Sequence, residues 1–145
     1  MNAKKVILAG LVVDILSLVV ALPSYYLFGW VFELEPASIW KWTPQTPLGS
    51  MSAGWLIFII ATNTALAIFF AFLYAVLFKA IPGTGIGKGL MFALLLYPVG
   101  VLVPMFSIYV LLNIAAGAVV YFTLQGLAEF LIYGAAVALV YKEKA

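Results

Sequence analysis

Long apolar segments run through most of this sequence, and their length limits the folds that it can adopt. Stretches at about 6–32, 53–78 and 90–141 contain few polar residues. A helix crosses a bilayer with about 20 apolar residues, so the first two stretches allow one crossing each and the third allows two. Hydrophobic residues make up 67% of the 145 residues and charged residues only 8%, unlike a soluble domain. We therefore expect an integral membrane protein embedded in the lipid bilayer.

The third stretch divides most simply at Asn113, its least hydrophobic point. This division predicts one membrane domain over 1–145 with four transmembrane helices. The spans are placed at about 6–32, 53–78, 88–111 and 115–141. Pro98 and Pro104 fall inside the third span, where a membrane helix tolerates a kink if neighbouring helices cover the freed carbonyl groups.

The lysines support four spans. Both termini and the glycine-rich turn at 79–89 then share one side of the membrane. That side holds Lys4, Lys5, Lys79, Lys88, Lys142 and Lys144. Only Lys41, in the loop at 33–52, lies opposite, and an excess of positive charge marks the cytoplasmic side. A rival division that ends a helix near Pro104 creates a fifth segment and places the C-terminal lysines outside. We expect an all-α, antiparallel four-helix transmembrane bundle in the inner (plasma) membrane, with both termini cytoplasmic.

The tryptophans all flank or occupy the external loop at 33–52. They are Trp30, Trp40, Trp42 and Trp55. Indole rings favour the membrane–water interface, so these residues are predicted to be interfacial anchors. A ligand-binding aromatic box is the alternative. At the end of the loop, Ser50 or Ser52 is the expected N-cap of the second span.

Several residue types that carry chemistry are missing. The sequence contains no His and no Cys, and its seven basic residues are all lysines. This composition excludes the usual zinc, haem and iron–sulfur sites and a bidentate arginine clamp for phosphate. We therefore expect no metal and no cofactor, and a metal site built from oxygen ligands alone is the alternative that the sequence leaves open. The net charge of +2 is too small to indicate binding to nucleic acid.

Two acidic residues lie inside predicted spans, where ionisable groups are rare and are candidates for function. At helical rise, Asp14 lies about 12 Å and Glu129 about 18 Å from the cytoplasmic ends of their spans. Asn63, Tyr97 and Gln125 lie at similar depths. These five residues are the candidate intramembrane polar cluster.

Neighbouring residues extend this cluster along the helices. Gln125 and Tyr133 are each one turn from Glu129, on the same face of the fourth span. Thr62, Asn63 and Thr64 form a polar group in the second span, and Ser17 lies close to one turn from Asp14.

Three interpretations of the acidic pair remain open. The acids hold the helices in register through hydrogen bonds, they line a path for protons, cations or a small solute, or they act as acid and base on a lipid or quinone. We favour the first. The chain is then a structural, accessory or interaction protein and not an enzyme, with a small transporter or channel component and a lipid- or quinone-binding protein as alternatives.

Small residues recur at four-residue spacing on the fourth span. They are Gly126, Gly134 and Ala138, with Phe130 between them. Small faces allow close approach of helices, either within one bundle or between copies. Packing within the bundle is the interpretation that we favour, and a homo-oligomer or a larger membrane complex is the alternative.

The glycine-rich turn does not match a phosphate-binding loop. That motif requires Gly and Ser or Thr at positions that are occupied here by Pro82 and Gly89. The stretch from Tyr74 to Leu90, YAVLFKAIPGTGIGKGL, followed by Phe92 and by a C-terminal helix with Gly134 and Tyr141-Lys142, resembles small prokaryotic four-span membrane proteins of uncharacterised function. The resemblance implies a topology and a prokaryotic membrane, and it implies no activity.

Overall fold

The computed structural model describes residues 2–34, 52–112 and 114–141, and this part of the chain contains helices and no strand. The long helices are α1 (Ala3–Leu27), α2 (Ala53–Leu77) and α5 (Ala116–Val140). A fourth long helical segment, Gly85–Leu111, consists of α3 (Gly85–Tyr97), a π-helical turn (Pro98–Leu102) and α4 (Val103–Leu111). Each of these four segments is long and apolar enough to cross a membrane.

Side chains cap the first two helices. The Asn2 side chain accepts a hydrogen bond of 3.3 Å from the backbone N–H of Lys5. Ser52 does the same for the N–H of Trp55, at 3.2 Å, so of the two candidates Ser50 and Ser52 it is Ser52 that caps α2. Side-chain caps of this kind help to satisfy the backbone donors in the first turn of a helix. The other predicted N-cap, Ser50, lies outside the described residues.

The two prolines of the third span do not divide it into two membrane segments. Pro98 begins the π-helical turn, and the N–H of Val103 donates to the Pro98 carbonyl across this wider turn. A proline removes one backbone donor, and a π-helical turn adapts the hydrogen-bond ladder to that loss. Among the described residues, the prediction of four apolar spans rather than five is therefore confirmed.

Two predicted boundaries were wrong. α1 ends at Leu27, not at 32, and the chain continues as the 3-10 helix η1 (Gly29–Glu33), in which Val31 and Phe32 are buried. The turn at 79–89 was placed too far along the chain, because α3 already begins at Gly85. Its later glycines are helical, and Gly83 and Gly85 carry the positive φ angles, +93° and +52°, that the turn requires. The predicted break at Asn113 lies outside the described residues.

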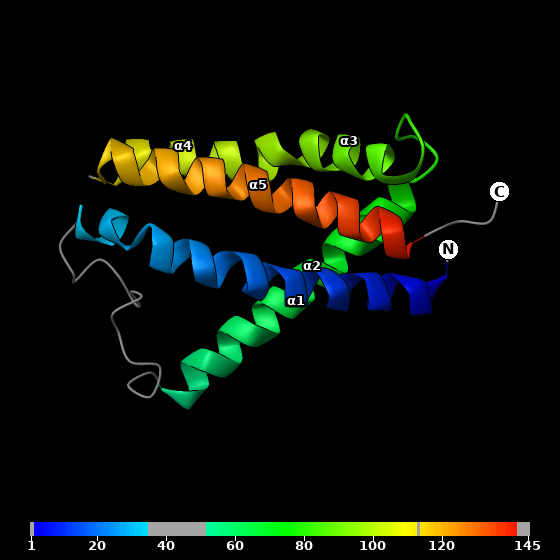
Figure 1. Ribbon diagram of the computed structural model, residues 1–145, viewed down its shortest axis with the longest axis horizontal. Coiled ribbons are helices and arrows are strands. Elements are labelled where there is room, and N and C mark those ends of the chain that lie inside the picture. The colour runs from blue at the N-terminus through cyan, green and yellow to red at the C-terminus, as the bar shows by residue number, and fades with distance from the viewer. Residues whose placement is uncertain (1, 35–51, 113, 142–145) are drawn as a thin grey trace.

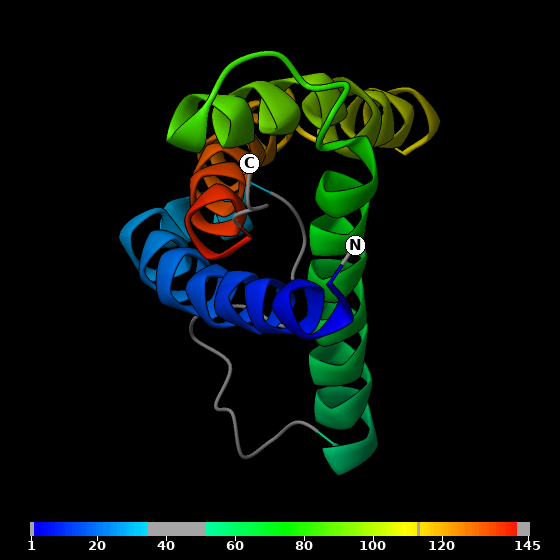
Figure 2. The ribbon, with the colours of Figure 1, turned by 90° about the vertical axis from the view of Figure 1, so that its right-hand side faces the viewer.

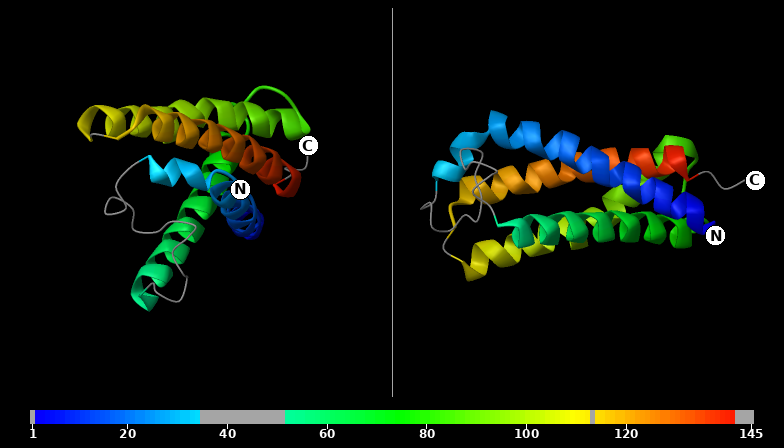
Figure 3. Two further views of the ribbon diagram at one scale, coloured as in Figure 1. Left: turned by 60° about the vertical axis from the view of Figure 1, so that its left-hand side comes forward. Right: turned by 90° about the horizontal axis from the view of Figure 1, so that it is seen from below.

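Three of the long segments run alongside one another, and α2 crosses them obliquely (Figure 1). α5 packs against α3 and α1, whereas α2 packs chiefly against α1. Seen from the end that carries the N-terminus, α2 stands apart from α5 (Figure 2). The Ala53 end of α2 lies farthest from the other helices, as the left view of Figure 3 also shows. The helices therefore converge at one end of the molecule and spread at the other.

The buried core lies at the converging end, where α1 begins and α5 ends (Figure 1). Tyr74 of α2 and Phe92 of α3 are almost fully buried there, with ring centroids 5.2 Å apart. Nearby, a side chain on Gly10 would meet the backbone of Ile68 at 2.6 Å, so this glycine allows α1 and α2 to cross closely. Large aliphatic and aromatic side chains cover much of the remaining surface, as expected of helices that face lipid.

Candidate ligand-binding cleft

The divergence of α2 leaves a cleft of about 980 Å³ between this helix and the other three segments. Small-molecule sites in proteins have volumes of about 300–1,000 Å³. Several side chains at its edge are well exposed, including Phe58 at 67%, Leu66 at 59% and Val99 at 72%. The cleft is therefore open to the surroundings of the helices along one side.

Most of the cleft is apolar and aromatic. α2 supplies Phe58, Phe69 and Phe70, and α5 supplies Phe122 and Phe130. The Phe70 ring meets the Phe130 ring edge to face, with centroids 5.7 Å apart. Aromatic walls of this kind bury a large area and favour a ligand with a flat or bulky apolar body.

One ionisable carboxyl group reaches the cleft, that of Glu129 on α5. Gln125 Nε2 donates to Glu129 Oε1 at 2.8 Å, and the Tyr133 hydroxyl donates to Glu129 Oε2 at 3.1 Å. Both carboxyl oxygens therefore accept a hydrogen bond from their own helix, one turn before and one turn after. The four-residue spacing seen in the sequence had placed these three side chains on one face.

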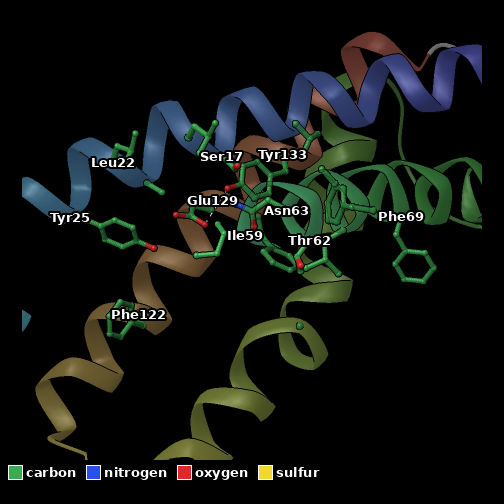
Figure 4. A pocket seen from close by; sticks show the side chains of 18 of the residues that line it. Ser17, Leu22, Tyr25, Ile59, Thr62, Asn63, Phe69, Phe122, Glu129 and Tyr133 are labelled. Atoms are coloured by element: carbon green, nitrogen blue, oxygen red, sulfur yellow. Dashed lines mark hydrogen bonds between the residues drawn. The ribbon is translucent and has the colours of Figure 1, made fainter. Parts of the chain in front are cut away.

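Polar groups from three helices meet around Glu129 (Figure 4). The Tyr25 hydroxyl of α1 points toward the carboxyl group and interacts with it electrostatically. Asn63 of α2 and Tyr133 of α5 lie on other sides of the same group. Ser17 and Thr62 also line the cleft, and the Ser17 hydroxyl donates to the Asp14 carbonyl at 2.7 Å. A mostly apolar cavity with a few convergent polar groups is the usual form of a ligand site.

The candidate cluster from the sequence is divided in the structure. Gln125, Glu129 and Asn63 lie at or beside the cleft, but Asp14 is not among the residues that line it. Asp14 Oδ2 instead accepts a hydrogen bond of 2.7 Å from the Thr64 hydroxyl, which joins α1 to α2. Tyr97 donates to the Thr123 carbonyl at 3.0 Å and joins α3 to α5. The expectation of a single cluster fails because equal depth does not determine which way a side chain points around its helix.

The small-residue face of α5 packs inside the molecule. A side chain on Gly134 would collide with the Gly89 carbonyl of α3, and Ala138 lies close to Gly89 as well. Gly126 faces Val101 of the π-helical turn, with 2.8 Å from its ideal Cβ position to the nearest methyl carbon. This packing within the molecule therefore covers the small-residue face. The alternative from the sequence was that this face contacts a second copy of the chain.

The predicted tryptophan anchors lie in different surroundings. Trp30, in η1, is 56% exposed, whereas Trp55 lies near the start of α2 and lines the cleft. Trp40 and Trp42 lie outside the described residues. Trp55 is thus an intrinsic fluorescent reporter inside the cleft.

Tyr25 and the phenylalanine walls were not predicted as parts of a site. Tyr25 follows a Pro-Ser pair near the end of α1, and phenylalanine is common on any lipid-facing helix, so neither stands out in the sequence. The four-residue spacing from Gln125 to Tyr133 was the informative signal. The divergence of α2, which creates the cleft, has no local sequence signature.

No protein-family model, no curated protein and no solved structure matches this chain. The resemblance of the stretch from Tyr74 to Leu90 to uncharacterised four-span proteins stays a prediction.

Proposed function

We propose that the protein binds a small amphipathic molecule that enters the cleft sideways from the lipid bilayer. The observation that carries this proposal is the cleft of about 980 Å³ whose apolar walls surround the Glu129 carboxyl group. In a bilayer, the open side of such a cleft faces the lipid tails, and apolar molecules dissolve in that layer. The proposal corresponds to the lipid- or quinone-binding alternative, and no catalytic step is part of it.

The polar groups support a ligand with one polar end. Glu129, Tyr25 and Asn63 lie around one point of the cleft, and aromatic and aliphatic side chains line the rest. Ligand sites combine apolar walls with a few convergent polar groups, so this arrangement favours a ligand whose polar end reaches these side chains. The ligand's apolar body then extends along the phenylalanine walls toward the lipid.

We further propose that the four spans form an antiparallel transmembrane bundle with both termini in the cytoplasm, in an inner (plasma) membrane. The lysines of the described residues support this orientation. Lys4 and Lys5 lie at the start of α1, and Lys79 and Lys88 flank the turn before α3, all at the converging end of the helices. The diverging end of the helices then lies in the outer half of the membrane.

Purification in mild detergent followed by native mass spectrometry tests the binding proposal. The unmodified chain is expected to carry one bound small molecule that bulk lipid does not account for. Ala21→Phe, which adds a ring inside the cleft, is expected to remove that molecule. Ala128→Phe is the matched control, because Ala128 is exposed on α5 and is not among the residues that line the cleft.

The proposal is rejected if the unmodified chain carries only bulk lipid, or if the two alanine variants retain the molecule equally. Purification of the chain with a stoichiometric protein partner whose helix crosslinks to the cleft would instead favour the accessory role. Thermal unfolding of both variants shows whether the added ring acts on ligand or on folding.

A further inference from the structure

We propose that the ligand of this cleft is a lipophilic organic cation, which binds to the Glu129 carboxylate in exchange for a proton. This inference rests on the proposed function, since it names the chemical class that the same cleft would take. Among the described residues that line the cleft, Glu129 is the only one with an ionisable acidic or basic side chain of the Asp, Glu, Lys or Arg kind.

A carboxyl group in this position has two ways to avoid an isolated charge. In a medium of low dielectric constant an unpaired carboxylate is strongly disfavoured, so the group either holds a proton or faces a cation. All lysines of the described residues lie near helix ends at the converging end of the molecule. Glu129 thus lies inside the membrane with no lysine of the described residues near it. A cationic ligand in the cleft could then act as its counter-ion.

The hydrogen bonds prepare Glu129 for the charged form. Gln125 Nε2 and the Tyr133 hydroxyl donate to separate oxygens of the carboxyl group. Two donors directed at two oxygens stabilise a carboxylate, because both of its oxygens are strong acceptors. In a protonated carboxyl group the hydroxyl oxygen is a weaker acceptor. Once a cation neutralises the charge of Glu129, these bonds hold the carboxylate in place.

The walls favour an organic cation over a metal ion. Among the described residues, no group of three or more acidic side chains is placed to hold a metal. The Phe70 ring instead contacts both the Phe130 ring and the Tyr133 ring, with centroids 5.7 and 6.3 Å apart. Aromatic faces attract cations, most strongly where water is excluded, and they also pack against the apolar body of a bulky cation.

The exchange balances in charge and atoms. The protonated Glu129 releases one proton to water, and the resulting carboxylate pairs with one monovalent cation, so the net charge of the cleft does not change. The titratable groups that face Glu129 are Tyr133 on its own helix and Tyr25 and Tyr121 by electrostatic interaction. Asp14 bonds to Thr64 outside the cleft. Binding should therefore strengthen as the pH rises and Glu129 loses its proton more readily.

The test uses tetraphenylphosphonium, a bulky aromatic cation, and triphenylphosphine oxide, a neutral molecule of related shape. Quenching of Trp55 fluorescence measures binding to the detergent-solubilised full chain, with the other tryptophans replaced by phenylalanine. We expect saturable binding of the phosphonium, at least about tenfold weaker binding of the neutral molecule, and release of about one proton per bound cation into weakly buffered solution.

The acidic residues provide the matched pair of variants. Glu129→Gln is expected to abolish both the preference for the cation and the proton release, while Asp14→Asn is expected to retain both. Equal binding of the two probes, or cation binding without proton release, overturns this inference and leaves the proposed function standing. Because proton release is measured on the native acids, the test holds even if Glu129→Gln fails to fold. Absence of any bound molecule in the mass-spectrometric experiment would reject the proposed function separately.

Discussion

At the scale of single residues, the two intramembrane acids have different partners. Asp14 and the Thr64 hydroxyl form a bond between α1 and α2, and Glu129 is bonded within α5 and faces the cleft. A hydrogen bond between membrane helices gives a partner to polar groups that would otherwise be unsatisfied in lipid. The structure therefore favours a role in stability for Asp14 and leaves Glu129 as the acid that can meet a ligand.

The substitution Thr64→Val tests the role of Asp14. Valine keeps the shape of threonine but removes the donor, so we expect the free energy of unfolding to fall by about 1–2 kcal/mol. Unfolding by sodium dodecyl sulfate in mixed micelles measures the change. Thr64→Ser, which keeps the hydroxyl group, is the control and should lie closer to the unmodified chain. Equal losses in the two variants would show that the hydrogen bond contributes little.

At the scale of helices, glycines set how closely the segments pack. A side chain on Gly89 would collide with the Gly134 carbonyl and would lie 2.7 Å from Ala138 Cβ, so α3 and α5 are in backbone contact. On the same helix, Gly87 has open space where a side chain would be added. The two glycines are two residues apart in sequence and differ completely in their surroundings.

This difference predicts opposite effects of one substitution. Gly89→Ala is expected to destabilise the protein by about 1–3 kcal/mol, because the new methyl group forces the two helices apart. Gly87→Ala is expected to be neutral or to stabilise α3 by up to about 1 kcal/mol, since alanine is the better helix former. Thermal unfolding of both variants in the same detergent makes the comparison. A destabilised Gly87→Ala together with an unaffected Gly89→Ala would contradict the helix contact described here.

Helix existence and local spacing could be predicted from the sequence, but helix orientation could not. The four apolar segments and the face shared by Gln125, Glu129 and Tyr133 depend on residues close together in the chain, where helical geometry decides the neighbours. The pairing of Asp14 with Thr64 and the collision of Gly89 with Gly134 depend on how each helix is rotated and tilted. Apolar side chains surround most of each helix, so the few polar residues do not reveal that rotation.

At the scale of the whole molecule, the two ends differ. The aromatic core around Tyr74 and Phe92 joins the helices at the converging end, and the cleft takes up the space where α2 diverges. If both termini are cytoplasmic, as proposed, this asymmetry places the packed core toward the cytoplasm and the cleft toward the outer half of the membrane. The proposed orientation therefore decides from which leaflet a ligand enters.

The absence of cysteine makes this orientation easy to measure. Single substitutions Ala3→Cys and Thr84→Cys lie at the converging end, and Leu112→Cys lies at the other end of the molecule. A membrane-impermeant maleimide should label Leu112→Cys in intact cells, and should label the other two only after the membrane is opened. The reverse pattern would contradict the proposed orientation and would place the diverging end of the helices on the cytoplasmic side.

The close crossing of α1 and α2 at Gly10 and Ile68 has a mechanical consequence. α2 packs chiefly against α1, and the Asp14–Thr64 hydrogen bond joins the two helices again near this crossing. From Thr64 to Ala53 the remaining arm of α2 is about 16 Å long at the rise of an α-helix. A small rotation of α2 at the crossing would therefore be magnified along this arm into a change in the width of the cleft.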